Sequence, residues 1–226
     1  MLVLVPLVCW AWIIALSRDM YGPMTGAGAW MMTPVWNMPH LFLLWAMWAV
    51  MMVAMMLPSA APMIVLAGGG RAYFVALGYL MVWAIFSAGA TGLQWMLMHR
   101  AILTPMMDLS NQIAAACVLL LAGLYQLTPL KRACLATCQS PMAFLTQRWR
   151  SGSFGAFRMG VDHGVFCVGC CWALMLLLFA GGVMNLAAIA ALTVFVAFEK
   201  LVPLGVWSAR ASGVALILFA AWVGLR

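Results

Sequence analysis

One short segment of the chain, Met159 to Trp172, concentrates side chains that bind soft metals. It reads MGVDHGVFCVGCCW, lies in an apolar stretch, and holds His163, Cys167, Cys170 and Cys171. A helix turns by roughly 100° per residue, so all four side chains fall within an arc of roughly 100°. One helix face would therefore carry an imidazole and three thiols. Donors of this kind suit Cu(I), zinc or an iron–sulfur cluster.

The same face has two other interpretations. Cys167 and Cys170 form a CxxC, which performs redox chemistry in thioredoxin-like proteins. Buried cysteines also serve as plain packing. Cu(I) is satisfied by two or three soft ligands, whereas structural zinc takes four. Because one helix face rarely supplies four ligands to one ion, a metal site here needs a donor from another helix.

Further soft ligands lie outside this segment. Cys134 and Cys138 are four residues apart in the polar stretch 130–153, so a helix would place both on one face. Upstream, one helical stripe carries a histidine and three thioethers: His40, Met47, Met51 and Met55. We interpret this stripe as a row of ligands that leads inward from the histidine. Ordinary contact with lipid or with neighbouring helices is the alternative.

The composition is that of a membrane protein. The 226 residues are 68% hydrophobic and only 7% charged, against roughly 45–50% apolar and 25% charged in soluble domains. A chain so apolar is expected to cross the lipid bilayer several times. The net charge of +7 then reflects basic loops at one membrane face, so nucleic acid is not an expected partner. Seven cysteines, mostly within apolar segments, argue against an extracellular disulfide framework.

We expect an all-α bundle of about seven transmembrane spans, forming one domain over residues 1–226. Pro58 and Pro62 are expected to interrupt the second span. The pair Glu199 and Lys200 is typical of a helix end at the membrane surface. The predicted spans cover residues 2–17, 40–57, 72–98, 111–127, 154–180, 183–198 and 209–225.

Basic residues predict the orientation of this bundle. With seven spans, eight of the eleven Lys and Arg residues lie in the loops of one side, and the positive-inside rule places that side in the cytoplasm. The N-terminus would then be cytoplasmic, and the Met-rich loop 20–38 with His40 would face outward. Cys134 and Cys138 would face the cytoplasm. Cys167 would lie near the middle of the bilayer.

Three stretches of the chain resemble a bacterial family of predicted metal-binding integral membrane proteins of unknown function. They read WAMWAVMMVAMMLPSAAPM, PLKRACLATCQSP and MGVDHGVFCVGCCWALM, and the resemblance extends over roughly residues 36–200. It implies a multi-pass protein of the bacterial inner membrane that binds a metal, and it implies no reaction. The positions that match the HGxxCxGCCW and CLxxC motifs are Cys134, Cys138, His163, Cys167, Cys170 and Cys171.

Taken together, the sequence predicts a membrane protein that binds a soft transition metal. Cu(I) is the favoured metal, with zinc or another soft metal as the alternative, and the role would be copper acquisition, transport or delivery. The expected partners are the lipid bilayer, the metal ion, and a metallochaperone or a membrane complex. A membrane thiol–disulfide oxidoreductase and an accessory subunit are the rival functions. Enzymatic activity is not the favoured reading, and without a GxxxxGK[ST] motif active transport would need a gradient or a partner.

Overall fold

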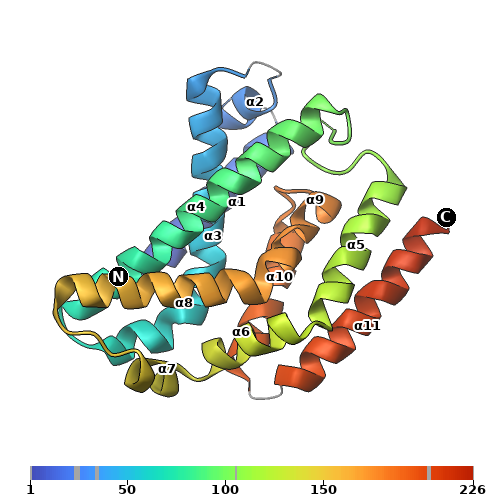
Figure 1. Cartoon of the computed structure of the whole chain (residues 1–226). Coiled ribbons are helices and arrows are strands. Elements are labelled where there is room, and N and C mark those ends of the chain that lie inside the picture. The colour runs from blue at the N-terminus through green and yellow to red at the C-terminus, as the bar shows by residue number, and fades with distance from the viewer. Residues whose placement is uncertain (1, 23–25, 34–35, 105, 203–204, 226) are drawn as a thin grey trace.

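The computed structural model describes residues 2–22, 26–33, 36–104, 106–202 and 205–225, and the regular elements in these ranges are all α-helices (Figure 1). The all-α class predicted from the sequence is therefore confirmed. In chain order the helices are α1 (Leu4–Met20), α2 (Ala27–Met31), α3 (Met38–Ala67), α4 (Arg71–His99), α5 (Gln112–Gln126), α6 (Pro129–Gln139), α7 (Pro141–Gln147), α8 (Gly152–Met175), α9 (Leu177–Gly181), α10 (Leu186–Leu201) and α11 (Gly205–Gly224).

Several of these helices have the length and composition of membrane spans. Within the described ranges, four segments are long and apolar enough to cross a membrane: Met38–Ala67, Arg71–His99, Gly152–Gly181 and Trp207–Gly224. α5 and α6 meet at a bend of 66° and make a fifth crossing if the bent pair is one span. α1 and α10, with 17 and 16 residues, fall short of the roughly 20 residues that a span needs. Membrane association is indicated, whereas seven spans and a cytoplasmic N-terminus stay predictions.

The second predicted span is longer than expected, because Pro58 and Pro62 lie inside α3 and do not end it. Proline lacks the N–H that would continue the helical hydrogen bonds, and membrane helices tolerate this where neighbouring groups satisfy the backbone. The carbonyls that lose a helical donor are those of Ala54 and Pro58, and between them the carbonyl oxygen of Met56 accepts from the hydroxyls of Tyr79 and Ser59, at 3.1 and 2.9 Å. The continued helix carries Met56 and Ser59 into the core.

Glycines let α4 and α8 approach each other closely. A Cβ atom added at Gly160 of α8 would collide with the backbone carbonyl of Val75, and one at Gly78 of α4 would collide with that of Phe157. Small residues at such contacts allow two helix backbones to touch, which is a common packing mode in membranes. α3 packs against α4 in turn. The buried face of α8 therefore lies against the core that these helices form.

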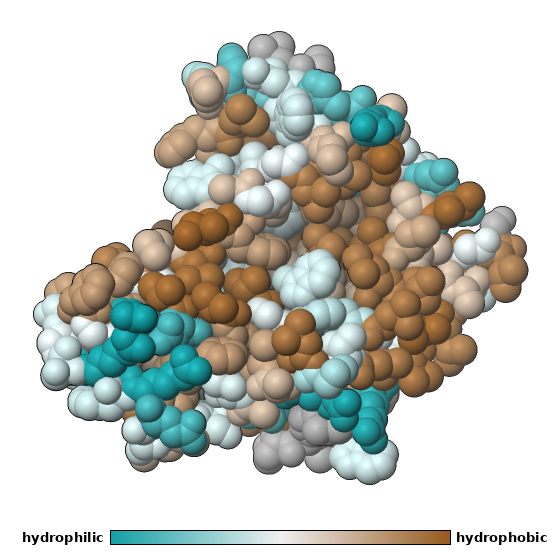
Figure 2. All heavy atoms as spheres, viewed as in Figure 1, coloured by the Kyte–Doolittle hydropathy of each residue, from teal (hydrophilic) through white to brown (hydrophobic). Residues whose placement is uncertain are grey.

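α5 and α11 form a second unit, side by side at the right of Figure 1. Gly123 and Gly213 lie at their contact, and large apolar side chains are exposed on both helices, including Ile113, Leu124, Leu218, Phe219 and Trp222. Figure 2 shows a mostly hydrophobic surface over this side of the molecule. An apolar surface of this extent fits contact with lipid.

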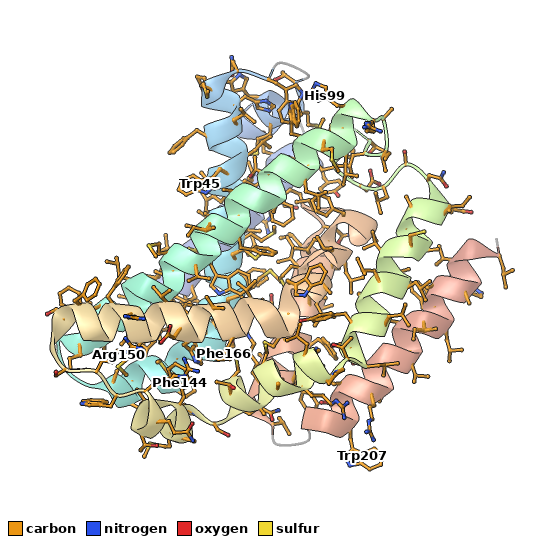
Figure 3. All side chains as sticks on the ribbon, in the orientation of Figure 1. Trp45, His99, Phe144, Arg150, Phe166 and Trp207 are labelled. Carbon is orange, nitrogen blue, oxygen red and sulfur yellow. The ribbon has the colours of Figure 1, made fainter. Side chains whose placement is uncertain are left out.

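A hydrophilic patch lies at the opposite side of the same view. Figure 2 shows it at the lower left, where Figure 3 labels Arg150. Arg148 and Arg150 precede α8 and contact the carboxylate of Asp162 at 3.6 and 3.9 Å. These partly exposed ion pairs contribute little to stability. They mark a polar end of α8, as expected for a helix that leaves the apolar layer.

The glycine contact between α4 and α8 predicts a position-dependent effect of added methyl groups. Gly160→Ala should destabilise the protein by about 1–3 kcal/mol, because the new Cβ meets a backbone carbonyl that cannot move aside. Gly89→Ala is the matched control, since Gly89 lies in α4 with no other atom within 4 Å of an added Cβ. The measurement is the thermal unfolding midpoint in detergent. Equal midpoints for the two variants would contradict the close α4–α8 contact.

Candidate metal centre

The predicted ligand face of α8 is buried in the core. His163 is 3% exposed, and Cys167, Cys170 and Cys171 are each 1% exposed. The helical spacing read from the sequence places them on the side that faces α3, α4 and α6. All three thiols are free, with no disulfide. The structure therefore places the three thiols on one buried face of α8, as the helical spacing predicts.

Cys167 is the central residue of this face. Its sulfur lies 2.9 Å from the ammonium nitrogen of Lys200 and 3.0 Å from the hydroxyl oxygen of Tyr79. The thiols of Cys170 and Cys171 donate to its backbone carbonyl oxygen, at 3.1 and 2.9 Å. Polar groups from α4 and α10 thus converge on one sulfur atom of α8. A buried sulfur with this many polar contacts is not simple apolar packing.

Two further sulfur pairs flank Cys167. The sulfur of Cys171 lies 4.0 Å from the thioether sulfur of Met56 in α3, and the sulfur of Cys170 lies 4.0 Å from that of Cys138 in α6. We call these five residues the sulfur cluster: Met56, Cys138, Cys167, Cys170 and Cys171. Three helices therefore supply the sulfur donors. A metal site on α8 needs a donor from another helix, and α3 and α6 each provide one.

Cys134 lies beside this cluster without a recorded contact to its sulfurs. A Cβ atom added at Gly169 of α8 would lie 2.8 Å from the sulfur of Cys134, so α6 packs on α8 at this glycine. The hydroxyl of Tyr125 donates to the carbonyl of Gly169 at the same place. Of the predicted pair in α6, Cys138 joins the cluster and Cys134 lies one turn away.

Lys200 departs from the sequence-based expectation. The pair Glu199 and Lys200 was expected at the membrane surface, yet the two residues are only 2% and 5% exposed. Glu199 forms an ion pair with Lys131 at 2.7 Å, whereas Lys200 donates to Ser59 at 3.3 Å besides its contact with Cys167. The physical reason is that α6 covers this end of α10 and supplies the countercharge for the carboxylate.

Lys200 and Met56 are the two cluster contacts that the spacing of ligand residues did not reveal. Lys200 also lies 3.6 Å from the sulfur of Met56. A signal was present for the lysine, because an ionisable residue that follows an apolar helix without a polar loop is often functional in membrane proteins. Met56 follows Met55 by one residue and therefore points roughly 100° away from it, on the flank of the stripe.

His163 lies at the edge of the cluster. Its ring packs against those of Phe144 and Tyr79, and its Nδ1 atom is buried without a hydrogen-bond partner. Together with Cys138 and Lys200 it lines a cavity of about 170 Å³. An unsatisfied ring nitrogen beside a thiol and a cavity is a position from which an imidazole can bind a ligand or a metal.

The upstream stripe occupies a different part of the core. Met47, Met51 and Met55 are buried on α3, at 1% exposure or less. His40 lies at least three helical turns before Met56 on α3. Its Nε2 atom lies 3.2 Å from the carbonyl oxygen of Met31, which accepts a hydrogen bond when that nitrogen is protonated. Its ring contacts the rings of two tryptophans, Trp30 and Trp36. The structure does not bring this histidine to the sulfur cluster, and a metal-binding role for the stripe stays a prediction.

The cluster offers a metal pairs of sulfur donors rather than a closed set of ligands. In the described part of the chain, no three side chains of the types His, Cys, Asp and Glu converge to hold one ion. The arrangement instead offers pairs of sulfurs at 4.0 Å. A metal about 2.3 Å from each of two such sulfurs, the zinc–thiolate bond length, would subtend an angle of about 120°. That angle is the trigonal one, which fits three soft ligands around one ion.

The ion pair between Lys131 and Glu199 predicts an asymmetric effect of removing one partner or both. Lys131→Met should destabilise the protein by about 3–5 kcal/mol, because it leaves a buried carboxylate without a countercharge. The double variant Lys131→Met/Glu199→Gln should recover most of this loss. Thermal unfolding in detergent measures both. A double variant no more stable than the single one would show that this pair is not the interaction that holds α6 on α10.

Comparison with known proteins gives one match. A family model described as PpoB2, copper chaperone, matches residues 45–223. No curated protein and no solved structure matches the chain. The matched range contains the whole sulfur cluster together with Tyr79, His163 and Lys200. It covers most of the chain, which therefore belongs to the PpoB2 copper chaperone family.

Proposed function

We propose that this protein binds Cu(I) at the sulfur cluster and passes it to an acceptor protein at the membrane. The observation that carries this proposal is that sulfurs from α3 and α6 meet the thiol-bearing face of α8, where Cys171 lies 4.0 Å from Met56 and Cys170 lies 4.0 Å from Cys138. The family name supports copper as the metal. Thiolates and thioethers are the soft donors that select Cu(I).

The donor set favours copper over zinc for a structural reason. A structural zinc site closes with four ligands, usually thiolates and imidazoles. The described residues offer sulfur pairs and a thioether, and a thioether is a poor ligand for zinc but a good one for Cu(I). We therefore assign Cys167 as the central ligand. Cys171 and the thioether of Met56, whose sulfurs lie 4.0 Å apart, complete the coordination.

The finer arrangement in the membrane is part of the same proposal. Seven spans in a bacterial inner membrane, with the N-terminus in the cytoplasm, would place Cys134 and Cys138 on the cytoplasmic side. His40 and the stripe of Met47, Met51 and Met55 would then receive copper from the outer side. Reduced thiols persist in the cytosol, whereas thioethers and imidazoles bind copper outside it without forming disulfides.

Copper would leave the cluster by ligand exchange. A thiolate of the acceptor binds the ion and one Cu–S bond to the protein breaks, and the same exchange, repeated for each remaining ligand, transfers the ion. No oxidation or reduction takes place, and the displaced thiolate takes up a proton. Such exchange needs no nucleotide, which agrees with the absence of a GxxxxGK[ST] motif from the sequence.

A copper titration tests the proposal. The protein is purified anaerobically in detergent and titrated with Cu(I) in competition with a chromogenic chelator. The wild type should bind stoichiometric copper, and Cys167→Ser should weaken binding by more than about 100-fold, beyond the 10–100-fold typical of residues that only support ligands. Cys117→Ser is the matched control, because Cys117 is exposed on α5. Equal binding by Cys167→Ser and the wild type would refute the assignment.

A second candidate function is a membrane thiol–disulfide oxidoreductase. The observation that favours it is the 4.0 Å separation of the sulfurs of Cys138 and Cys170, which a small movement could shorten to the roughly 2.05 Å of a disulfide. Anaerobic native mass spectrometry separates the two functions. Bound copper that disappears in Cys167→Ser supports the chaperone. A metal-free protein with a reversible Cys138–Cys170 disulfide supports the oxidoreductase. If neither bound copper nor a reversible disulfide is observed, the cysteines have a packing role.

A further inference from the structure

Lys200 is a buried cation whose nearest neighbours are donors of the sulfur cluster. Its ammonium nitrogen lies 2.9 Å from the sulfur of Cys167, 3.3 Å from the hydroxyl of Ser59 and 3.6 Å from the sulfur of Met56. The residue is only 5% exposed. A buried charge is costly unless a countercharge lies beside it. The identity of that countercharge therefore decides what Lys200 does.

The carboxylates of the chain do not provide it. There are four acidic residues, and in the described ranges none forms an ion pair with Lys200. Glu199 is held by Lys131, and Asp162 lies beside Arg148 and Arg150. The anion available to Lys200 is instead a thiolate of the cluster, since the thiolate is the form in which cysteine binds metal.

The charge of the loaded centre then depends on the metal. Two thiolates and one Cu(I) ion carry a net charge of −1, which the ammonium of Lys200 brings to zero. Two thiolates and one Zn(II) ion are already neutral, so the same ammonium leaves a charge of +1. An uncompensated charge in a buried, apolar site is strongly unfavourable. The thioether of Met56 is neutral and does not alter this sum.

A third thiolate would neutralise the zinc centre, but the structure does not place one. In the described part of the chain, no three His, Cys, Asp or Glu side chains converge on one point. The cavity of about 170 Å³ that Lys200 and Ser59 line gives the ammonium room to shift as a metal enters. It can do so without losing the thiolate beside it.

We infer that Lys200 is a specificity-determining residue that makes the sulfur cluster selective for monovalent soft ions, Cu(I) above all, over divalent ions such as Zn(II). This inference rests on the proposed copper binding at Cys167. Lys200 acts through its charge on the bound complex and is not itself a ligand. Its effect must therefore have opposite signs for the two classes of ion, which a merely structural role would not produce.

The test measures Cu(I) and Zn(II) affinities of the wild type and of Lys200→Met by chelator competition in detergent under anaerobic conditions. Lys200→Met should bind Cu(I) more weakly and Zn(II) more tightly, each on the order of 10-fold. The ammonium of Lys200 is the countercharge of the Cu(I) complex, whereas beside the neutral Zn(II) complex it is an uncompensated buried charge. Lys200→Arg keeps the charge and should keep the preference. Lys200→Gln is a second uncharged variant if the methionine variant does not fold.

Two controls separate charge at the site from charge elsewhere. Arg158→Met removes an exposed cation from α8, and Arg210→Met removes an exposed cation from α11. Both should keep the wild-type ratio of Cu(I) to Zn(II) affinity. Parallel shifts for the two metals in Lys200→Met, or an unchanged ratio, would overturn the inference. Failure of the proposed function is distinct, because the wild type itself would then bind no Cu(I).

The wild-type protein offers an independent measurement that needs no Lys200 variant. Ag(I) and Cd(II) are both soft ions that bind thiolates, and they differ in charge. The preference of the protein for Ag(I) over Cd(II) should exceed that of a short Cys-x-x-Cys peptide without a neighbouring cation. A protein preference equal to or below that of the peptide would count against the role of Lys200.

Discussion

The contact between the ammonium of Lys200 and the sulfur of Cys167, at 2.9 Å, is the interaction on which the arrangement of the core depends. It links α10 to α8 inside an apolar bundle, where an unpaired charge would be too costly to keep. The neighbouring carboxylate of Glu199 cannot take over this role, because Lys131 holds it from α6. Two adjacent charges on one helix are thus directed to different partners.

The way α10 is held explains how that separation arises. Successive residues of a helix point roughly 100° apart. Gln126 of α5 donates to the carboxylate of Glu199 at 3.2 Å, and Gln139 of α6 donates to its backbone carbonyl at 2.7 Å. These contacts fix one side of the helix end. Lys200 is therefore turned toward α3 and α8, where Ser59 and Cys167 receive its hydrogen bonds.

The sequence predicted the all-α class and one face of the site, for reasons that are local. Helical periodicity places His163 and the three thiols of α8 on one side, and burial of that side follows from the apolar composition. Pro58 and Pro62 were misleading, because the effect of a proline on a helix depends on whether a neighbour satisfies the backbone.

The remainder of the site depends on contacts between helices, which spacing does not encode. Nothing in the CLxxC motif says that Cys138 and not Cys134 approaches Cys170. The choice depends on the angle at which α6 follows α5, a bend of 66°. Likewise, the stripe of thioethers on α3 has the expected periodicity, but the residue that contacts a thiol is Met56. Two helices that cross meet over a short length, so only one methionine of a long row can lie at the crossing.

Burial places a constraint on how copper delivery, as proposed, would proceed. Cys167, Cys170 and Cys171 are each 1% exposed, so an acceptor protein cannot reach them directly. Cys138 is partly exposed, and it lines the cavity that also reaches His163 and Lys200. An incoming thiolate would therefore meet copper first at Cys138, and the ion would move outward by exchange between neighbouring sulfurs. A copper carrier must protect Cu(I) from solvent and must also release it to a partner. The buried thiols would provide the protection, and the partly exposed Cys138 would provide the exit.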